Sequence, residues 1–334
     1  MPLVSDLPPR VPLARLPTPL EASPRLGARL GLDLLYKRDD LTGLELSGNK
    51  ARKLEFLVAD AEAAGADVLV TCGGVQSNHC RATAFAAARR GLGAVLLLRT
   101  PDPAAPPPPE ANALLDRLAG AEVRHVSHDE YRRRGEVMAA LADTLRAAGR
   151  RPYVVPEGGS NGLGSLGYVL AMAELHDQLP PAWRDGPVTI AYAAGSGGTG
   201  AGIELGIRLL GWRGASAIGY AVCNDARYFR ETIAAICADA RRRWPWLPAV
   251  SADAVHVDDG FVGPGYAEAT DAGLEIIRRA AREDGVLLDP VYTGKAMLGL
   301  ATRSAEDALP SRRAVLVHTG GAFGTFPYAR LLVP

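Results

Sequence analysis

The feature that most constrains the fold is a regular alternation of two kinds of apolar run, which continues along the chain from about residue 67. Short runs such as 67–71, 94–98 and 188–193 have the length and composition of buried strands. Longer alanine-rich runs with helical spacing separate them, as in the crossovers that join parallel strands. The pattern therefore predicts an α/β protein built from open, doubly wound parallel sheets.

The remaining elements follow from the same criteria. The expected strands are 32–37, 67–71, 94–98, 123–126, 153–155, 188–193, 217–222, 286–288 and 314–318. One expected helix begins at Lys50, and the others cover 79–90, 111–118, 129–148, 166–179, 201–210, 228–243, 268–283 and 295–307. The proline-rich segments 7–21 and 101–110 are expected to lie on the surface without regular structure.

The length of the chain bounds its domain organisation. With 334 residues and 48% hydrophobic composition, it is long enough for one large domain or two intimate ones and can bury a substantial core. We expect a small α/β domain at 52–163 and a large α/β domain formed by 1–51 and 164–334.

Charge and composition exclude several kinds of partner. Lysine plus arginine equals aspartate plus glutamate, at 37 each, so no overall field attracts nucleic acid or an anionic membrane. No apolar run approaches the roughly 18 residues that a membrane span requires. The four cysteines have no CxxC spacing and the first residues lack a signal-peptide pattern, so we expect free thiols in a cytoplasmic protein. The histidines show no ligand spacing, and no metal site is expected.

The segment SGNKARKLEF (47–56) places a lysine at the start of a helix, because apolar residues follow Lys50 at helical spacing. The positive end of the helix dipole and the nearby charges of Arg52 and Lys53 should lower the pKa of Lys50. An unprotonated amine can form an imine with a carbonyl, so Lys50 is a candidate catalytic residue. A solvated basic face is the alternative interpretation of this segment.

Four expected strands end in glycine-rich loops that lead into helices. These loops are 71–79, 158–164, 195–200 and 318–324. The carboxyl ends of parallel strands meet at one edge of a sheet, which is where open α/β sheets bind ligands. Ser77 and Asn78 lie at a helix start, where free N–H groups would bind a carboxylate. In the third loop, glycines allow close approach of the backbone to a phosphate, and Thr199 offers a hydroxyl.

The loop 195–200 also matches the pattern G-x-G-x-x-G, which is typical of dinucleotide binding. Asp225 lies roughly where such a site places an acid. A nicotinamide-dependent oxidoreductase is therefore an alternative. It gives no role to Lys50 or to Ser77, and glycine loops of this spacing accept other phosphates.

Two loop tyrosines are candidate acid–base groups. Tyr266 follows a Gly-Pro-Gly turn, and Tyr292 lies in the loop before the expected helix at 295–307. Half-buried packing is the alternative role for each of them. His79 and Cys80 adjoin Ser77 but point in different directions along a helix, so Cys80 is not expected to act as a nucleophile.

Six motifs follow one another along nearly the whole chain. They are LPTPLE (16–21), KRDD (37–40), GNKARKLE (48–55), QSNH (76–79), DPVYTGK (289–295) and HTGG (318–321). In this order they resemble the D-cysteine desulfhydrase and 1-aminocyclopropane-1-carboxylate deaminase family. The resemblance implies pyridoxal 5′-phosphate as cofactor, the fold type II architecture shared with the tryptophan synthase β subunit, and a homodimer.

The resemblance also implies roles for the candidate residues. Lys50 would carry the cofactor as an imine and then act on the Cα proton of the substrate. Ser77 would hold the substrate carboxylate, and Tyr266 and Tyr292 would be acid–base or gating phenols. Further cofactor contacts would come from Asn78, Gly195, Ser196, Gly197, Gly198, Thr199, Thr293 and Thr319. The substrate-binding residues would be Ser77, Asn78, His79, Gly159 and Ser160.

Position 293 favours one branch of this family. The ring-opening deaminases that resemble this chain carry a glutamate after the second tyrosine, where it pairs with the pyridine nitrogen, whereas this chain has Thr293. A hydroxyl at Thr293, together with Thr319, would leave that nitrogen largely neutral. A neutral ring suffices when electrons leave promptly with a β-substituent, so the substitution favours the desulfhydrase branch.

The resulting hypothesis is α,β-elimination from a small β-substituted amino acid, with D-cysteine giving pyruvate, hydrogen sulfide and ammonia as the leading reaction. Related alternatives are 1-aminocyclopropane-1-carboxylate deamination, elimination from β-chloro-D-alanine, and release of sulfite from L-cysteate. His79 could assist an anionic leaving group. A non-catalytic protein that binds pyridoxal phosphate is an alternative of another class, and it would need neither tyrosine.

Overall fold

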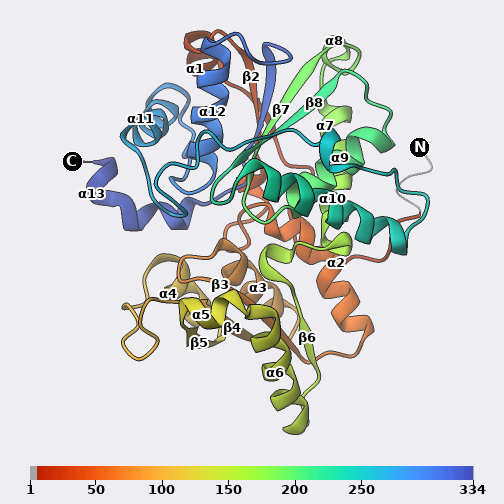
Figure 1. Cartoon of the computed structure of the whole chain (residues 1–334), viewed down its shortest axis with the longest axis vertical. Coiled ribbons are helices and arrows are strands. Elements are labelled where there is room, and N and C mark those ends of the chain that lie inside the picture. The colour runs from red at the N-terminus through yellow and green to blue at the C-terminus, as the bar shows by residue number, and fades with distance from the viewer. Residues whose placement is uncertain (1–5, 334) are drawn as a thin grey trace.

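In residues 6–333, which the computed structural model describes, the strands form two separate sheets, one of six strands and one of four (Figure 1). The strands within 68–154 form the smaller sheet, and the other strands form the larger one. The predicted α/β class with two doubly wound sheets is therefore confirmed. The exact domain bounds at 52 and 163 stay a prediction.

The six-stranded sheet has the order β1-β2-β10-β7-β8-β9. Its strands are β1 (Leu20–Ala22), β2 (Asp33–Lys37), β10 (Arg313–Val317), β7 (Val188–Ala194), β8 (Ala215–Ala221) and β9 (Val257–Asp258). All neighbours are parallel except β1, which pairs antiparallel with β2 at the edge. The central strand β7 is buried along its whole length, as expected of a parallel sheet with helices on both faces.

Helices cover both faces of the larger sheet. One face packs against α1 (Pro24–Arg29), α11 (Asp271–Arg279) and α12 (Thr293–Ala305), and the other against α7 (Gly162–Gln178), α9 (Gly198–Leu209) and α10 (Ala226–Arg243). Alternate residues of β7 enter the two cores: Ile190 and Tyr192 on the α7 side, Ala191 and Ala193 on the α12 side. Because successive side chains of a strand point to opposite faces of the sheet, this one apolar run contributes to both cores.

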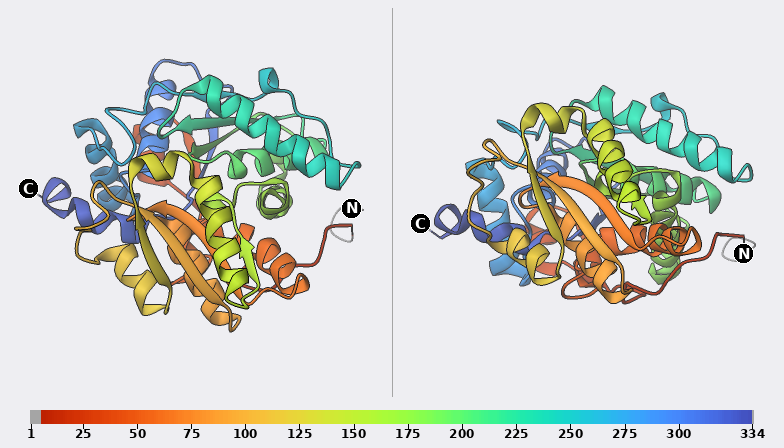
Figure 2. Two further views of the ribbon diagram at one scale, coloured as in Figure 1. Left: turned by 60° about the horizontal axis from the view of Figure 1, so that its bottom comes forward. Right: turned by 90° about the horizontal axis from the view of Figure 1, so that it is seen from below.

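The four-stranded sheet has the order β5-β4-β3-β6 and is parallel throughout (Figure 2). Its strands are β3 (Val68–Gly74), β4 (Gly93–Arg99), β5 (Glu122–Val126) and β6 (Pro152–Val154). Around it lie the helices α3 (Asn78–Arg89), α4 (Ala111–Leu118), α5 (His128–Arg132) and α6 (Arg134–Ala147). The proline-rich segment 101–110 forms an irregular loop, as predicted.

Helix α2 (Lys50–Ala63) belongs to the core that joins the two sheets. It packs against α7 of the larger unit and α3 of the smaller one, and nine of its residues are buried, including Leu54 and Phe56. The other short helical segments are α8 (Pro181–Arg184), α13 (Ala329–Leu332), Asp39–Leu41, Glu157–Gly159, Ala252–Ala254, Ala280–Asp284 and Ala322–Tyr328. None of the helices in 6–333 has the length and apolar character needed to cross a bilayer.

Several of the predicted elements are wrong in whole or in part. The segment 286–288 buries Val286 and Leu288 but makes no strand, because it packs its side chains on the sheet without pairing its backbone. The helix predicted at 129–148 is divided at Arg133, which leaves helical geometry (φ −100°, ψ 26°). The helix predicted from 268 begins at Asp271, because the Thr270 side chain caps the N–H of Gly273.

The strand orders create a switch point in each sheet. In the smaller sheet the chain runs from β3 through β4 to β5 and then returns to pair β6 on the other side of β3. In the larger sheet it runs from β7 through β8 to β9 and returns to place β10 on the other side of β7. Crevices at such points bind ligands, and the predicted loops after β3, β6, β7 and β10 start there.

A buried charge network fixes the start of α2. The guanidinium of Arg52 binds Asp39 through two bonds of 2.8 Å and binds Glu174 on α7 at 2.8 and 3.0 Å. Burial alone would raise the pKa of Asp39, but the charge and hydrogen bonds of Arg52 outweigh it and hold the pKa below its usual value. Tyr168 also donates to Asp39, at 2.6 Å.

We predict that Arg52→Met lowers the free energy of unfolding by about 3–5 kcal/mol, because it leaves buried carboxylates without their cation. Urea unfolding of the apoprotein measures this. Arg227→Met is the matched control: Arg227 pairs with Glu231 on an exposed helix face, and its loss should leave the unfolding midpoint unchanged. Equal midpoints for Arg52→Met and the unsubstituted protein would contradict the prediction.

Candidate functional site

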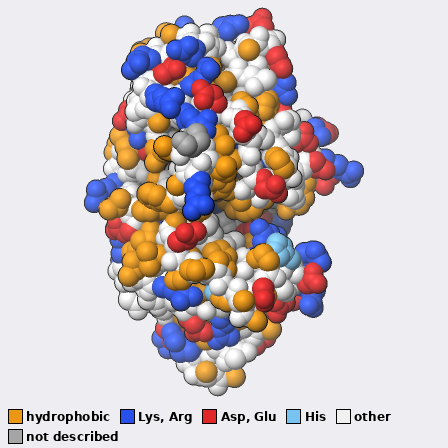
Figure 3. Space-filling view, turned by 90° about the vertical axis from the view of Figure 1, so that its left-hand side faces the viewer, with side chains coloured by type: hydrophobic (Ala, Val, Ile, Leu, Met, Phe, Trp, Pro, Cys, Tyr) orange, Lys and Arg blue, Asp and Glu red, His pale blue; other side chains and the backbone are white. Residues whose placement is uncertain are grey.

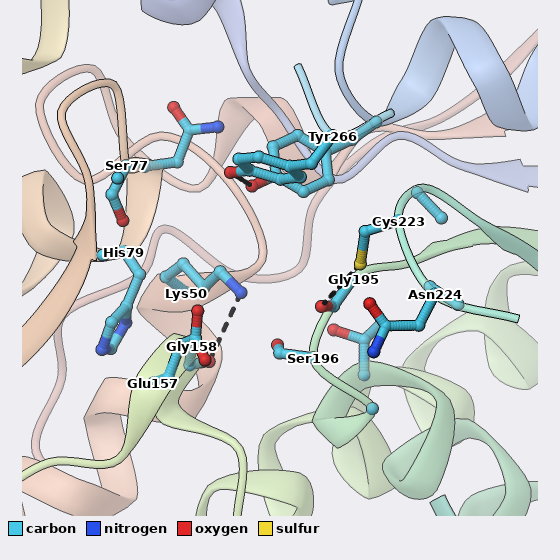
Figure 4. Close-up of a pocket in the computed structure, with 18 of the residues that line it drawn as sticks. Lys50, Ser77, His79, Glu157, Gly158, Gly195, Ser196, Cys223, Asn224 and Tyr266 are labelled. Carbon is cyan, nitrogen blue, oxygen red and sulfur yellow. Dashed lines mark hydrogen bonds between the residues drawn. The ribbon is translucent and has the colours of Figure 1, made fainter. Parts of the chain in front are cut away.

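A cavity of about 490 Å³ lies where the carboxyl ends of the strands of both sheets face each other. Its lining includes the loops after β3, β6, β7, β8 and β10, the end of β4 and the first residue of α2. Figure 4 shows Lys50 extending between the Ser77 loop on one side and the Gly195 and Ser196 loop on the other. The two switch points therefore contribute to one site.

Lys50 is the first residue of α2, and its half-buried side chain lines the cavity. Burial lowers the pKa of Lys50 to about 8, against the opposing charge of Glu157. Its Nζ donates a hydrogen bond of 3.3 Å to the carbonyl oxygen of Gly158. The predicted direction of the shift is therefore present, but its cause is desolvation, because Arg52 points away into the buried network.

Lys53 lies one helical turn further on and shares the same carbonyl. Its Nζ donates to Gly158 O at 3.3 Å and to Ser160 Oγ at 3.2 Å. Burial, followed by the charge of Lys50, lowers the pKa of Lys53 well below its usual value. Both amines therefore lie in a region where the protonated form is disfavoured.

The backbone before Lys50 is fixed by the loop after β10. Asn49 donates its N–H to the carbonyl of Thr319 at 3.1 Å, and its side-chain amide donates to Thr199 Oγ1 at 2.9 Å. Gly48 has φ +110°, and a Cβ there would lie 2.7 Å from Thr319 O. Position 48 therefore requires glycine for two reasons, the left-handed backbone and the close approach of the Thr319 loop.

The loop after β3 forms the predicted carboxylate site. Ser77 is the N-cap of α3 and accepts from the N–H of Cys80 at 3.2 Å, so the N–H groups of Asn78 and His79 stay at the open helix end. The ring of His79 is buried, with Nε2 at 2.9 Å from Thr71 Oγ1 and Nδ1 without a partner. Burial and the charges of Lys50 and Lys53 lower its pKa well below the usual value, so the ring is neutral.

The loop after β7 forms a cradle at the start of α9. Gly195, Ser196, Gly197, Thr199 and Gly200 line the cavity, and Gly197 has φ +83°. A Cβ on Gly195 would lie 3.1 Å from the ring of Tyr292, so the loop is closely approached from the cavity side. Free N–H groups at a helix N-terminus together with the Thr199 hydroxyl suit a phosphate.

Tyr266 and Tyr292 meet in the cavity wall, where Figure 4 labels Tyr266. Their hydroxyl oxygens are 2.6 Å apart and their rings are edge-on, with centroids 6.1 Å apart. Burial raises the pKa of Tyr266 to about 12, and burial followed by the Tyr266 charge raises the pKa of Tyr292 further. Both phenols are therefore protonated and can donate a hydrogen bond.

The structure brings most of the predicted residues together. Those that line the cavity are Lys50, Ser77, Asn78, His79, Gly195, Ser196, Gly197, Thr199, Tyr266, Tyr292 and Thr319. Gly159, Ser160, Gly198 and Thr293 are not in the lining. Direct ligand contact by these four residues stays a prediction.

Each of these four positions has a structural role. Ser160 Oγ lies 2.8 Å from Ser196 Oγ and accepts from the Gly198 N–H at 3.2 Å, which ties two loops together. Gly159 has φ +61° in the turn after β6. Thr293 Oγ1 donates to buried Asp289 at 2.7 Å and accepts from the Asp289 N–H at 2.8 Å. The Thr293 hydroxyl therefore binds Asp289 at the start of α12, and Thr293 is not among the residues that line the cavity.

Several lining residues were missed by sequence reasoning. They include Asn49, Arg99, Tyr131, Glu157, Cys223 and Asn224. Arg99, Glu157 and Cys223 each lie at or just after the carboxyl end of a strand, and this position was the signal that could have found them. Tyr131 had no such signal, because the predicted continuous helix 129–148 placed it on a helix face.

Asp225 does not act as the acid of a dinucleotide site. Its carboxylate accepts from the Tyr228 N–H at 2.7 Å and caps α10. In residues 6–333, no three histidine, cysteine or acidic side chains lie close enough together to hold a metal ion.

A family model described as "Pyridoxal-phosphate dependent enzyme" matches residues 11–320. The chain belongs to this family. Membership explains the buried lysine opposite a phosphate cradle, and the nicotinamide interpretation of the glycine loop is wrong.

Relatives with similar sequences support the assignment. The chain is 41% identical to a bifunctional D-cysteine desulfhydrase/1-aminocyclopropane-1-carboxylate deaminase of Arabidopsis thaliana, over 94% of this chain and 78% of that protein. It is 39% identical to a D-cysteine desulfhydrase of Salmonella newport, over 96% of both chains. A solved structure of an ACC deaminase homologue matches 99% of this chain and 97% of that chain with a TM-score of 0.89 and 34% identity. The chain is a pyridoxal-phosphate-dependent lyase of fold type II.

The residues present fit the cofactor. Lys50 offers an amine that lines the cavity, the start of α9 offers N–H donors for a phosphate, and the Tyr292 ring closely approaches the Gly195 loop. When bound, pyridoxal 5′-phosphate supplies an electron-accepting ring that makes the Cα proton of an amino acid removable. The chain's own residues must then orient the substrate, move the proton and exclude water.

We predict that covalent uptake of pyridoxal phosphate by the apoprotein has a pH midpoint of about 8, because only the unprotonated Lys50 amine reacts. Below the midpoint the rate should fall tenfold per pH unit, and above it the rate should level off. Stopped-flow absorbance of the bound cofactor measures this. A midpoint near 10.4, the value of an exposed lysine, would show that Lys50 is not desolvated.

Glu157→Gln provides a second arm of this experiment. The charge of Glu157 raises the pKa of Lys50, so its removal should move the midpoint below 8. A midpoint that moves upward would contradict the electrostatic assignment.

Proposed function

We propose that this enzyme catalyses α,β-elimination from D-cysteine, giving pyruvate, hydrogen sulfide and ammonia. Relatives that carry this activity in their names are about 40% identical over nearly the whole chain. The observation that carries the proposal is the arrangement of one amine, one helix end for a carboxylate and two protonated phenols around a single cavity. A small amino acid needs these three contacts.

Lys50 is proposed to remove the Cα proton. Its pKa of about 8 leaves a useful unprotonated fraction near neutral pH. The substrate carboxylate is proposed to bind at the start of α3, where Ser77 caps the helix and the N–H groups of Asn78 and His79 face outward. This contact would place Cα next to the lysine, since Lys50 and the Ser77 loop line the same part of the cavity (Figure 4).

The tyrosine pair is proposed to deliver a proton or a hydrogen bond to the departing β-substituent. A phenol with a raised pKa keeps its proton at neutral pH and can donate it in a hydrogen bond. The 2.6 Å hydrogen bond between Tyr266 and Tyr292 couples the two hydroxyls, so that a change in the polarity of one alters the other. At the ring nitrogen, Thr319 is the proposed partner, because Thr319 lines the cavity and Thr293 is engaged with Asp289.

1-Aminocyclopropane-1-carboxylate is the second candidate substrate, because a related structure carries the deaminase name. Elimination is favoured over ring opening because a threonine stands after the second tyrosine and its hydroxyl is occupied by Asp289. L-Cysteate is a third candidate of the same reaction class. A non-catalytic pyridoxal phosphate protein would need Lys50 and the phosphate cradle but not the tyrosines.

We predict that cofactor-loaded protein releases pyruvate and sulfide in equal amounts from D-cysteine, and that Tyr292→Phe lowers kcat by about 10²- to 10⁴-fold. Lactate-dehydrogenase-coupled pyruvate assay and sulfide detection measure both products. Lys50→Ala should abolish turnover and covalent cofactor binding. Turnover of 1-aminocyclopropane-1-carboxylate without turnover of D-cysteine would reject the proposed substrate, and unchanged kcat in Tyr292→Phe would reject the role of the phenol.

We also propose that the protein is a cytoplasmic homodimer. The thiols of Cys72, Cys80, Cys223 and Cys237 are all free, which suits a reducing compartment. Figure 3 shows hydrophobic side chains gathered across the middle of one side of the molecule. Helix α4 and the segment 322–328 touch, and each carries an exposed apolar side chain, Leu118 at 69% and Phe326 at 67%. Apolar surface of this kind is typical of subunit interfaces.

The double substitution Leu118→Glu with Phe326→Glu should convert the dimer to monomers, because it places charges in an apolar interface. Light scattering after size-exclusion chromatography measures the mass. Tyr228→Glu, at another exposed aromatic residue (43%), is the matched control and should leave the mass unchanged. A monomer in the unsubstituted protein would reject the proposed dimer.

A further inference from the structure

Arg99 is a lining residue of the cavity that the proposed reaction has not used. It is the last residue of β4, so it lies at the ligand-binding edge of the smaller sheet. A Cβ on Gly74 would lie 4.0 Å from both Arg99 Nη2 and the Tyr266 ring. The guanidinium is therefore between the loop that leads to Ser77 and the tyrosine pair.

Within residues 6–333, Arg99 differs from the two other arginines of the lining by having no acidic partner. Arg132 pairs with Asp129, and Arg134 pairs with Glu157 at 2.8 Å. Among the described residues, the guanidinium of Arg99 has no hydrogen-bond or ion-pair partner, and it lies against the faces of two aromatic rings. A guanidinium that faces a cavity without an anion is suited to bind an anion from the ligand.

The two rings hold Arg99 in place without using its donors. Its Cζ lies 4.8 Å from the Tyr131 ring centroid and 5.7 Å from the Tyr266 ring centroid. Stacking on a ring face leaves the N–H groups free in the plane of the guanidinium. Tyr131 is itself fixed, because its hydroxyl donates to Glu157. Arg99 is therefore a pre-positioned fork of free donors.

The charge balance of the cavity also favours an anionic ligand. Glu157 is the one carboxylate in the lining formed by the described residues. It is engaged by Arg134 and by Tyr131, so it does not neutralise Arg99. An anionic group that enters the cavity near the tyrosine pair meets an uncompensated positive charge.

We infer that Arg99 is a second anion subsite, separate from the start of α3, and that it binds the negatively charged substituent on the β-carbon of the substrate. The site then accepts amino acids whose β-substituent is a thiolate or a sulfonate. This inference rests on the proposed function in one respect, that the α-carboxylate binds at Ser77 and Asn78. The β-substituent then extends from Cα toward Tyr266 and reaches Arg99.

The elimination step defines what Arg99 does. The Cα–H bond breaks with its proton passing to Lys50, a Cα–Cβ double bond forms, and the bond from Cβ to the substituent breaks with its electron pair leaving on the substituent. The released 2-aminoacrylate takes up one water to give pyruvate and ammonia. A sulfonate leaves as sulfite, whereas a thiolate takes a proton from the Tyr266–Tyr292 pair as the bond breaks and leaves as hydrosulfide, and the pair regains that proton from solvent. Arg99 stabilises the negative charge on the substituent both before and after the bond breaks, and no oxidant or reductant takes part.

Calorimetry on the holoenzyme tests the subsite without turnover. The probes are 3-sulfopropanoate, which carries a carboxylate and a sulfonate but no amine, and butanoate, which carries the carboxylate alone. Arg99→Met should raise the Kd of 3-sulfopropanoate by about 10- to 100-fold, as expected for loss of a charge-assisted pair, and leave the Kd of butanoate within about twofold. Arg99→Lys should recover part of the affinity, because it keeps the charge.

Arg124→Met is the matched control. Arg124 lies on the neighbouring strand β5, pairs with Glu122 at 2.6 Å and is outside the cavity lining. It should change neither Kd. Thermal unfolding and the absorbance of bound cofactor show whether each variant is folded and loaded.

Three outcomes would overturn the inference. Equal losses for both probes in Arg99→Met would assign Arg99 to the α-carboxylate. No loss for either probe would assign it a purely structural role. Loss of cofactor absorbance in Arg99→Met would assign it to cofactor binding. Absence of turnover with D-cysteine and cysteate would reject the proposed function, whereas the calorimetric difference between the two probes would still report on the subsite.

Discussion

The bidentate ion pair between Arg52 and Asp39 is the interaction on which the site depends. Both side chains are almost completely buried, at 1% and 0% exposed, and the pair extends to Glu174 on α7 and to Tyr168. It therefore fixes the first turn of α2 against the larger sheet. A buried ion pair is a weak source of net stability but a strong source of geometric specificity in this site. The first turn of α2 is where Lys50 must be placed to within a fraction of an ångström.

The same helix turn carries three basic side chains in three different environments. Arg52 contacts acidic side chains and stays charged. Lys50 faces the cavity, and its pKa is about 8. Lys53 faces the loop after β6, and burial lowers its pKa well below the usual value. The difference between them comes from burial and from which acids are within reach. A single helical turn thus places one permanently charged anchor next to one reactive amine.

Much of the site could be predicted from the sequence because its residues follow strand ends. Ser77, Gly195 and Thr319 were identified in this way, and all three line the cavity. Thr293 shows that position in the sequence leaves the direction of a side chain open. Adjacent residues at a helix start point in different directions, and the hydroxyl of Thr293 is used by Asp289 while Tyr292 faces the cavity. The sequence shows which residues are adjacent along the chain, but it does not show where each side chain points.

The cause of the Lys50 shift shows the same limit. The sequence suggested helix dipole and neighbouring charge, whereas burial makes the largest contribution. Burial of Lys50 arises from loops after β3, β6 and β7, which are more than 20 residues away along the chain. Glu157 and Arg99 were not predicted for a related reason. Their roles in the site depend on the residues that face them across the cavity.

The sequence by itself determined the α/β class, the positions of most strands and helices, and the glycine loops that end the strands, because these depend on local periodicity and backbone freedom. It also determined the family, because the motifs occur in one order along nearly the whole chain. Only the tertiary structure decided which loops meet, which hydroxyls are free and which charges lack a partner. Those properties depend on the relative placement of two sheets, which is set by packing between segments far apart in the chain.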